Sequence, residues 1–250
     1  MSNRYKIIVA YDGTSYYGWQ VQTKLPTIAG TLQKSFHDVF HTPIPLLGAS
    51  RTDAGVHALG QVATFCAETQ VTPACMLKAW SNSLPPDIVI RSLELVSPDF
   101  NPHRDVLYKT YWYHFFVSRP HAFTQRYGLF FRLPLDLDKL QECLQIFVGT
   151  HDFRSFCTGD EMEDDTIRTV DSITLSYQEQ YDAYRIEVRG PRFLRHMIRR
   201  MVGAALDVAA RKMVSSDYLR QVLEEKNPRQ NLINAAPQGL LLHDIMYKKE

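Results

Sequence analysis

Hydrophobic and polar residues follow one another in short blocks that predict a mixed α and β fold. Apolar side chains in short runs or at alternate positions predict strands, and a spacing of three and four predicts helices. In the first part of the chain, strands are expected at 5–11, 44–47, 62–65 and 88–96, and helices at 27–40 and 73–83. The predicted order is therefore strand, helix, two strands, helix, strand.

The second part of the chain repeats this order with one additional helix. Strands are expected at 108–118, 169–177, 183–189 and 240–247, and helices at 136–147, 191–212 and 216–225. A short polar stretch containing Pro98 and Pro102 marks the boundary between the two parts. The order βαββαβ is that of the ferredoxin-like fold, which RNA-recognition domains also use. We therefore expect an α+β chain of two ferredoxin-like halves, residues 1–104 and 105–250.

Composition narrows the possible classes of protein. The chain has 250 residues, of which 45% are hydrophobic, enough for a sizeable core. Its apolar runs are short and broken by charge, and no signal-peptide pattern is present, so we expect a soluble cytoplasmic protein without a membrane span. The four cysteines are Cys66, Cys75, Cys143 and Cys157. They lack the CxxC spacing of a zinc site, and each is expected to be a small core residue.

Positive charge is concentrated locally, although the net charge is only +1. Arg192, Arg195 and Arg199 are spaced three and four apart, so on the predicted helix 191–212 they form one stripe. Gly190 and Pro191 would begin that helix, and apolar residues on two sides of it predict that it is packed on more than one face. Further basic residues flank the stripe at positions 185, 189, 200, 211 and 212. Such a stripe could pair with acidic groups elsewhere, but the local excess of positive charge favours a polyanion such as RNA.

The segment 49–61 contains a dense group of chemically active side chains. Arg51, Asp53 and His57 lie within it together with two glycines, between two predicted strands. Such a segment is open to two interpretations. It could be a hairpin whose Asp and Thr bond to their own backbone, or a loop that presents catalytic side chains from a rigid scaffold.

The strand predicted at 108–118 is unusually aromatic. Its residues alternate in orientation, so Lys109, Tyr111 and Tyr113 share one face while Tyr108 and Trp112 share the other. Most of these rings are expected in the core. One tyrosine near the start of the strand could instead stack on an RNA base.

Five segments together resemble the TruA family of tRNA pseudouridine synthases, in the expected order and over essentially the whole chain. They are 10–20 (AYDGTSYYGWQ), 51–58 (RTDAGVHA), 109–113 (KTYWY), 193–199 (FLRHMIR) and 236–240 (APQGL). The acidic run from Asp160 to Asp165 departs from the family pattern, and Ser50 and Trp112 replace residues that are more common in the family.

The resemblance implies an isomerase that converts uridines of the tRNA anticodon stem-loop to pseudouridine, without cofactor or metal. It implies a homodimer in which one antiparallel sheet runs through both halves beside a central basic cleft. Asp53 corresponds to the catalytic aspartate, Tyr111 to the active-site tyrosine, and Arg51 and Arg199 to the active-site arginines. Arg192 and Arg195, on the same basic helix as Arg199, are expected to bind the substrate.

The chemistry of the reaction assigns a role to each of these groups. A carboxylate such as Asp53 can act as nucleophile or as base, and an arginine partner, Arg199, would keep it ionised. Extruding a uridine costs a few kcal/mol. Stacking on Tyr111 would return roughly 1–3 kcal/mol, and Arg51 would fill the space left by the base. His57 is expected to hold the loop by a backbone hydrogen bond.

Two other classes of function remain compatible with these features. A non-catalytic RNA-binding protein or tRNA chaperone would use the basic and aromatic residues without needing Asp53. A metal-dependent nuclease would lose its activity with a chelator. The His-Asp pairs at residues 37–38, 151–152 and 243–244 could indicate a metal phosphohydrolase, but none of them is accompanied by the further ligands that such a site needs.

Overall fold

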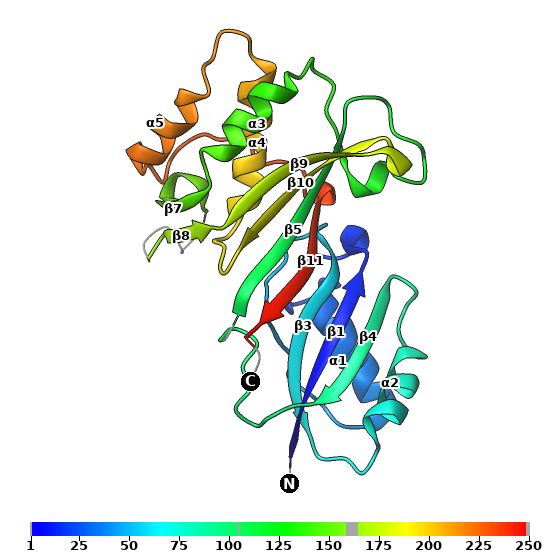
Figure 1. Cartoon of the computed structure of the whole chain (residues 1–250). Helices are drawn as coiled ribbons and strands as arrows, with labels where there is room; N and C mark the ends of the chain where they lie inside the picture. Colours follow the sequence, from blue (N-terminus) through cyan, green and yellow to red (C-terminus); the bar gives the residue numbers. More distant parts are fainter. Residues whose placement is uncertain (1, 105, 159–164, 249–250) are drawn as a thin grey trace. The chain divides into compact units, whose positions relative to one another are not determined.

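The computed structural model describes residues 2–104, 106–158 and 165–248. The chain divides into two compact units, each with its own strands and helices (Figure 1). Unit 1 comprises residues 1–107 and 241–250, and unit 2 comprises residues 108–240. The C-terminal strand thus belongs with unit 1, whereas the sequence had suggested a division at residues 104 and 105. The described residues form a mixed α+β structure with five α-helices and mostly antiparallel strands.

Unit 1 is built on a sheet in which β4, β1, β3 and β11 are neighbours in that order. Strand β3 pairs antiparallel with β1 and parallel with β11, and the short β2 also pairs with β3. Two helices complete the unit. The elements are β1 (Asn3–Tyr11), α1 (Ile28–Phe40), β2 (Leu47–Gly48), β3 (His57–Ala67), α2 (Pro73–Ser81), β4 (Ile88–Leu95) and β11 (Leu240–Tyr247).

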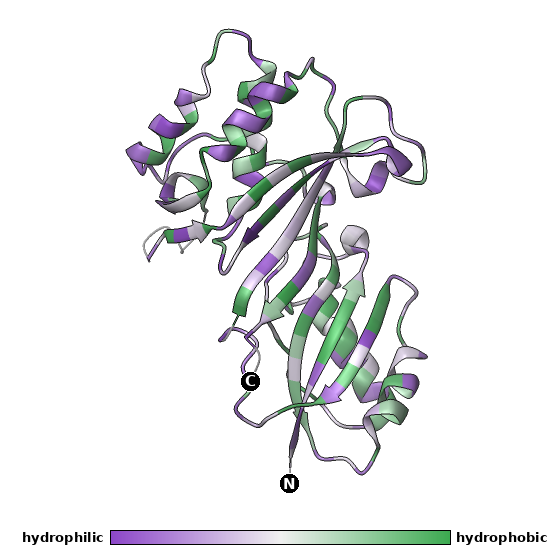
Figure 2. Ribbon diagram, viewed as in Figure 1, coloured by the Kyte–Doolittle hydropathy of each residue, from purple (hydrophilic) through white to green (hydrophobic). Residues whose placement is uncertain are grey.

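Local sequence explains where the helices of unit 1 begin. The hydroxyl of Thr27 accepts the N–H of Gly30 at the start of α1, and Thr72 caps α2 ahead of Pro73. The helices pack on the sheet through buried rings, because Phe36 of α1 and Trp80 of α2 both lie edge-on to Phe65 of β3. Figure 2 shows hydrophobic residues along much of β1 and β4, which flank this core.

Unit 2 contains a second antiparallel group, in which β5 pairs with β10 and β10 pairs with β9. The short β6 runs parallel to β5, and β7 and β8 form a separate pair. Helix α3 packs against both α4 and β9. The elements are β5 (Val106–Phe116), β6 (Leu129–Phe130), α3 (Leu137–Gln145), β7 (Gly149–Asp152), β8 (Ile167–Val170), β9 (Ser172–Gln178), β10 (Ala183–Gly190), α4 (Met197–Ala210) and α5 (Asp217–Glu225).

Four predicted elements differ clearly from the structure. The strand expected at 62–65 is longer at both ends, because β3 runs from His57 to Ala67. The helix expected at 191–212 begins only at Met197, after His196 adopts a left-handed conformation with φ of 61°, because the preceding segment turns to bury Leu194. The strand expected at 169–177 is two strands, β8 and β9, which separate at Asp171. The strand expected at 44–47 is reduced to Leu47–Gly48, since its proline-containing first part makes no ladder. The prediction that the long helix is packed on more than one face is confirmed, because nearly all of α4 is buried.

The cysteine prediction holds for two of the four residues. Cys143 and Cys157 are buried, whereas Cys66 and Cys75 are exposed, so the expectation that each is a core residue was wrong for these two. Cys66 pairs in register with the half-buried Arg4 on the face of the sheet opposite Tyr5 and Phe65. Alternation along β3 therefore directs it away from the helices. No helix in the described part of the chain is both long and apolar enough to cross a membrane.

Candidate active site

The segment that carries Arg51 and Asp53 is anchored through the residue between them. Thr52 is buried, its hydroxyl lies 2.7 Å from the Tyr11 hydroxyl, and its carbonyl accepts the N–H of Trp19. Arg51 is exposed and Asp53 is half-buried. The backbone therefore directs Thr52 inward and leaves the two ionisable side chains on its accessible side.

A buried amide clamps the loop from the other end. Gln61, on β3, is fully buried and bonds to both backbone groups of Ser50. Its amide nitrogen donates to the Ser50 carbonyl at 2.7 Å, and its amide oxygen accepts the Ser50 N–H at 3.2 Å. Because both groups of the amide are used, the clamp fixes the direction of the chain as it enters the loop. Sequence reasoning missed this role, and the only signal for it was a glutamine in the middle of a mostly apolar strand.

His57 has the structural role that the sequence predicted. Its ring is buried at the start of β3, and Nδ1 accepts the backbone N–H of Gly13 at 3.0 Å. Oδ1 of Asp12 lies 3.2 Å from the same nitrogen. Asp12 in turn accepts both the N–H and the hydroxyl of Thr14. The imidazole thus joins the far end of the loop to the 12–14 turn, and the expectation of a backbone bond is confirmed.

Gly18 allows the neighbouring chain to approach the loop closely. Its φ is +89°, and a Cβ at this position would lie 2.6 Å from the carbonyl oxygen of Thr52. Only glycine adopts this conformation without strain, and the space for a side chain is already occupied by backbone. The residue therefore holds the 18–19 segment against the loop that carries Asp53.

Replacing Gly18 with alanine is expected to destabilise the protein by about 2–3 kcal/mol, because both the positive φ and the contact with Thr52 become unfavourable. Urea unfolding followed by circular dichroism measures the effect. Ser15→Ala, at an exposed position of the same segment, serves as the control and should change the unfolding free energy by less than about 0.5 kcal/mol. Equal stability of the Gly18→Ala protein and the wild type would show that the close contact of Gly18 with the Thr52 carbonyl is not needed for the fold.

Tyr111 lies on β5, within unit 2, opposite Val188 of β10. The residue is 6% exposed, and its ring meets Phe193 edge-on, with centroids 5.4 Å apart. Lys109 precedes it by two positions on the same face of the strand, where Gly190 is the residue paired with it. Burial and the neighbouring Arg192 charge lower the pKa of Lys109 to about 8.

The lowered pKa of Lys109 predicts a specific dependence of stability on pH. Between the folded pKa of about 8 and the unfolded value near 10.5, the unfolded chain binds more protons, so this lysine favours the folded state increasingly as pH rises through that window. Wild-type protein should gain up to about 3 kcal/mol relative to Lys109→Met between pH 7 and 10.5. Parallel urea titrations of the two proteins measure this difference. A pH-independent difference would show that the lysine titrates normally.

Arg199 lies in the first turn of α4 and is tied to the chain that precedes β11. Its Nε donates to the Ala235 carbonyl at 2.8 Å, and the Ala235 N–H donates to the Arg199 carbonyl at 3.0 Å. We call residues 230–236 the strap, because they run along α4. The reciprocal bonds fix the direction in which the guanidinium of Arg199 points.

The strap contacts α4 at two further places. The buried Arg200 donates through Nη1 to the Cys157 carbonyl at 2.8 Å and through Nη2 to the Gln230 carbonyl. Burial lowers the pKa of this guanidinium. At Gly203 the helix has no side chain, and an added Cβ would overlap the carbonyl oxygen of Ile233. Arg200 therefore has a structural role, whereas Arg199, one position earlier, keeps part of its side chain accessible.

Arg192 and Arg195 do not lie on the helix, so the predicted stripe with Arg199 was wrong. Both are exposed in the irregular segment between β10 and α4. The segment is irregular there because Phe193 packs against Tyr111 while Leu194 is buried. The two arginines thus flank buried apolar anchors and do not follow a helical face.

Two of the flanking arginines lie on the other face of the sheet from Tyr111. Arg189 stacks over the ring of Tyr108 at 3.4 Å from its centroid, and Arg185 stacks over Trp112 at 4.3 Å. Trp112 also donates its indole N–H to Glu187 at 2.8 Å. These arginines are held by aromatic rings on the side without Tyr111, so they do not extend the positive region around that residue.

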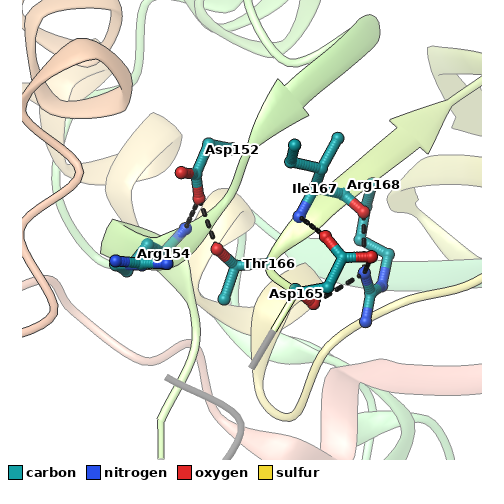
Figure 3. A network of polar contacts seen from close by, with 6 residues as sticks. All are labelled: Asp152, Arg154, Asp165, Thr166, Ile167 and Arg168. Atoms are coloured by element: carbon teal, nitrogen blue, oxygen red, sulfur yellow. Dashed lines mark hydrogen bonds and ion pairs between the residues drawn. The ribbon is translucent and has the colours of Figure 1, made fainter. Parts of the chain in front are cut away.

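The acidic run falls largely outside the described residues, which include only Asp165 of it. That residue ends the run with a turn, accepting the Ile167 N–H at 3.0 Å, while Arg168 donates to its backbone carbonyl (Figure 3). Nearby, Asp152 accepts from the N–H of Arg154 and the hydroxyl of Thr166. Within the described residues, no group of three or more His, Cys, Asp or Glu side chains is arranged to hold a metal ion.

The expected site residues fall into two sets. Arg51 and Asp53 share one loop of unit 1, whereas Tyr111, Arg192, Arg195 and Arg199 belong to unit 2. Within unit 2, Arg192 and Arg195 lie in the irregular segment before α4, Tyr111 contacts that segment through Phe193, and Arg199 is held by the strap. The first set contains a carboxylate on a rigid loop, and the second contains an aromatic ring with cations.

Comparison with known proteins identifies the family. The tRNA pseudouridine synthase family model matches residues 7–103 and 143–248. The chain is similar to tRNA pseudouridine synthase A of Exiguobacterium sibiricum, with 38% identity covering 98% of this chain and 96% of the relative. It is also similar to proteins of that name from Thermodesulfovibrio yellowstonii, with 35% identity over 97% and 98% of the two chains, and from Latilactobacillus sakei, with 34% identity over 99% and 100%.

Among solved structures, a chain of a Cbf5–Nop10–Gar1 complex has 11% identity and a TM-score of 0.33, covering 80% of this chain and 54% of the other. This structural likeness is too weak to support a conclusion about the fold. The sequence matches, in contrast, extend over nearly the full length of both partners. The chain therefore belongs to the tRNA pseudouridine synthase family and is an isomerase that acts on uridine in tRNA.

Proposed function

We propose that this isomerase converts uridines of the tRNA anticodon stem-loop to pseudouridine and that Asp53 is its catalytic carboxylate. The observation that carries the proposal is the way the loop is held. Buried Thr52 and the Gln61 clamp fix its backbone, while Asp53 stays half-buried beside the exposed Arg51. A carboxylate that is fixed in position and still accessible is suited to attack a bound nucleotide.

The reaction needs no external reactant. The bond between the base nitrogen and the sugar breaks, the base turns, and a carbon of the same base bonds to the sugar, so no atom is gained or lost. Asp53 can contribute as a nucleophile, as carboxylates do in retaining glycosidases, or as a base. Both roles require the ionised carboxylate. We infer that Arg199 pairs with it, which favours that form.

Two further residues have roles in handling the extruded base. We infer that Tyr111 stacks on the uridine and that Arg51 occupies the space the base leaves. Stacking on one aromatic ring returns roughly 1–3 kcal/mol, comparable with the cost of extruding a base. The exposed position of Arg51 next to Asp53 and the anchoring of Tyr111 by Phe193 support these roles. Arg192 and Arg195, both exposed, would contact the RNA backbone.

We propose further that residues 1–104 and 105–250 are ferredoxin-like halves that share one sheet beside a basic cleft. The sheet is mostly antiparallel, and not wholly antiparallel as the sequence had suggested, because β11 runs parallel to β3. The order β4-β1-β3, with β2 pairing to β3, supports this for the first half. The second half departs more from that pattern because it contains the additional strands β6, β7 and β8. The resemblance to the family also supports a cytoplasmic homodimer.

The decisive experiment maps pseudouridine in an unmodified tRNA transcript after incubation with the purified protein. Carbodiimide labelling and primer extension should show new stops in the anticodon stem-loop. A matched transcript in which cytidine replaces those uridines should show none. The same stops should appear in the presence of EDTA.

The other outcomes of this experiment identify the rival functions. Binding of the transcript without new stops would indicate a non-catalytic RNA-binding protein or chaperone. Cleavage that EDTA abolishes would indicate a nuclease. New stops confined to another arm of the tRNA would retain the isomerase and reject the anticodon stem-loop as its substrate.

A further inference from the structure

Tyr113 is a buried tyrosine of β5 to which neither the proposed mechanism nor the family resemblance gives a role. It lies two positions after Tyr111, on the same face of the strand. Its exposed fraction is 0%, so it is not placed to contact a substrate. Its hydroxyl instead donates to the carbonyl of Ala236, at the end of the strap, at 2.9 Å.

The bond to Ala236 adjoins the place where the strap holds Arg199. The preceding residue, Ala235, accepts the Nε of Arg199 on its carbonyl at 2.8 Å and donates its N–H to the Arg199 carbonyl at 3.0 Å. Tyr113 and Arg199 therefore bond to the carbonyls of consecutive residues. Because a single rigid peptide group joins those residues, a shift of Ala236 also moves the acceptor that holds the Arg199 side chain.

The end of the strap is fixed from β5, whereas its start and middle are fixed from α4. On the α4 side, Arg200 donates to the Gln230 carbonyl, and Gly203 lies against Ile233. On the β5 side, a Cβ at Gly239 would lie 2.5 Å from Cζ of Tyr113, so the chain that leaves the strap packs directly on the same ring.

The Tyr113 hydroxyl is the shorter of two bonds to the Ala236 carbonyl. The other comes from the N–H of Gly239 at 3.4 Å, within the same short turn. That second bond is local and joins the strap only to itself. The hydroxyl, in contrast, joins it to the strand that carries Tyr111.

We propose that Tyr113 is a positioning residue, whose hydroxyl sets the place of Arg199 relative to Tyr111 through the strap. This inference rests on the proposed function, because it takes Arg199 as the partner of the catalytic carboxylate and Tyr111 as the ring that stacks on the uridine. Both residues then act on one nucleotide, so their separation has to be held to within about 0.5 Å. A tyrosine suits this task, since its hydroxyl is carried on a rigid ring with only two torsions to fix.

A purely structural role for the hydroxyl makes a different prediction. Removing a hydroxyl that bonds to a backbone carbonyl lowers stability wherever it occurs, because the carbonyl loses a partner. Tyr247 offers the matched case, since its hydroxyl donates to the Pro102 carbonyl at 3.0 Å, away from every proposed site residue in the sequence. Tyr113→Phe and Tyr247→Phe should therefore lower the urea midpoint of unfolding to a similar extent. Only a positioning role makes their turnover differ.

Turnover of the two variants is measured on tRNA that carries tritium at C5 of uridine. The label is released when C5 bonds to the sugar, so the assay counts each isomerised uridine whatever its place in the tRNA. Under single-turnover conditions, Tyr113→Phe should be about tenfold slower than wild type, while its affinity for the tRNA stays within threefold. Tyr247→Phe should stay within twofold of wild type in both quantities. Equal turnover of the two variants would overturn the inference.

A double-mutant cycle tests whether the hydroxyl acts through Arg199. Arg199→Lys keeps the positive charge but lacks the Nε that bonds to Ala235, so its side chain is no longer held by the strap. Adding Tyr113→Phe to Arg199→Lys should therefore slow turnover less than twofold. A further tenfold loss would show that the hydroxyl acts on another group or on the fold as a whole, and it would equally overturn the inference.

These outcomes are separable from those of the proposed function. Normal turnover of Tyr113→Phe together with an inactive Asp53→Asn would remove the inference and leave the catalytic assignment intact. Wild-type turnover of Arg199→Met would reject the role proposed for Arg199, and the positioning role of Tyr113 with it. Pseudouridine mapped to another arm of the tRNA would reject the anticodon stem-loop as substrate and leave the result of the cycle unchanged.

Discussion

Asp53→Asn should abolish pseudouridine formation while tRNA binding stays nearly intact. Asparagine keeps the size of the side chain and removes the charge and the nucleophilic oxygen, so the loss falls on the chemical step. Turnover should decrease at least about a thousandfold. The loop itself should persist, because its anchors are Thr52, Gln61 and His57, and the unfolding free energy should change by less than about 1 kcal/mol.

Single-turnover assays on the unmodified transcript, together with filter-binding measurements, separate these two effects. Asp38→Asn is the matched control, since it makes the same substitution at an exposed carboxylate of α1 that pairs with Lys34. Its turnover should equal that of wild type. Residual activity of Asp53→Asn within about tenfold of wild type would remove Asp53 from the catalytic role.

Gly203→Ala should impair both stability and turnover, although Gly203 is not one of the proposed site residues. An added Cβ would overlap the Ile233 carbonyl oxygen and approach the Ala235 N–H to 2.9 Å, and both of these atoms are backbone. The strap would have to move, and the two bonds that hold Arg199 to Ala235 would be strained. We expect a loss of about 3 kcal/mol in unfolding free energy. In the protein that remains folded, turnover should fall at least tenfold and tRNA affinity should change less than threefold.

Gly30→Ala provides the control for Gly203→Ala, because it makes the same change inside a helix. A Cβ at Gly30 would lie 2.8 Å from the side-chain oxygen of Thr27 and would not meet a backbone atom there, so its cost is limited to the N-cap bond that this oxygen makes, about 1 kcal/mol. Its stability should remain within about 1 kcal/mol of wild type and its turnover unchanged. If Gly203→Ala loses stability but the folded fraction turns over normally, the strap does not position Arg199. If it loses neither, the close contact with Ile233 is absent in solution.

Sequence periodicity predicted most helices and strands because their signals are local. The spacing of Ile28, Leu32 and Phe36 identifies α1, and the C-terminal strand was predicted with the bounds that the structure has. The long helix was predicted to begin at residue 191, before its actual start at Met197, because residues 192–195 have the spacing of a helix. The competing factor was tertiary: Phe193 packs against Tyr111 and Leu194 is buried, which the chain achieves with an irregular segment that ends at His196.

For the active site, the sequence by itself determined the family and predicted which residues carry the chemistry, because the motif around Asp53 and the aromatic strand are contiguous in the chain. It also predicted that His57 is structural. Only the tertiary structure decided how those residues are held. The Gln61 clamp, the strap on Arg199 and the bond from Tyr113 to Ala236 all join residues that no local pattern connects. Their effects arise from burial and from distances across the fold, which periodicity does not encode.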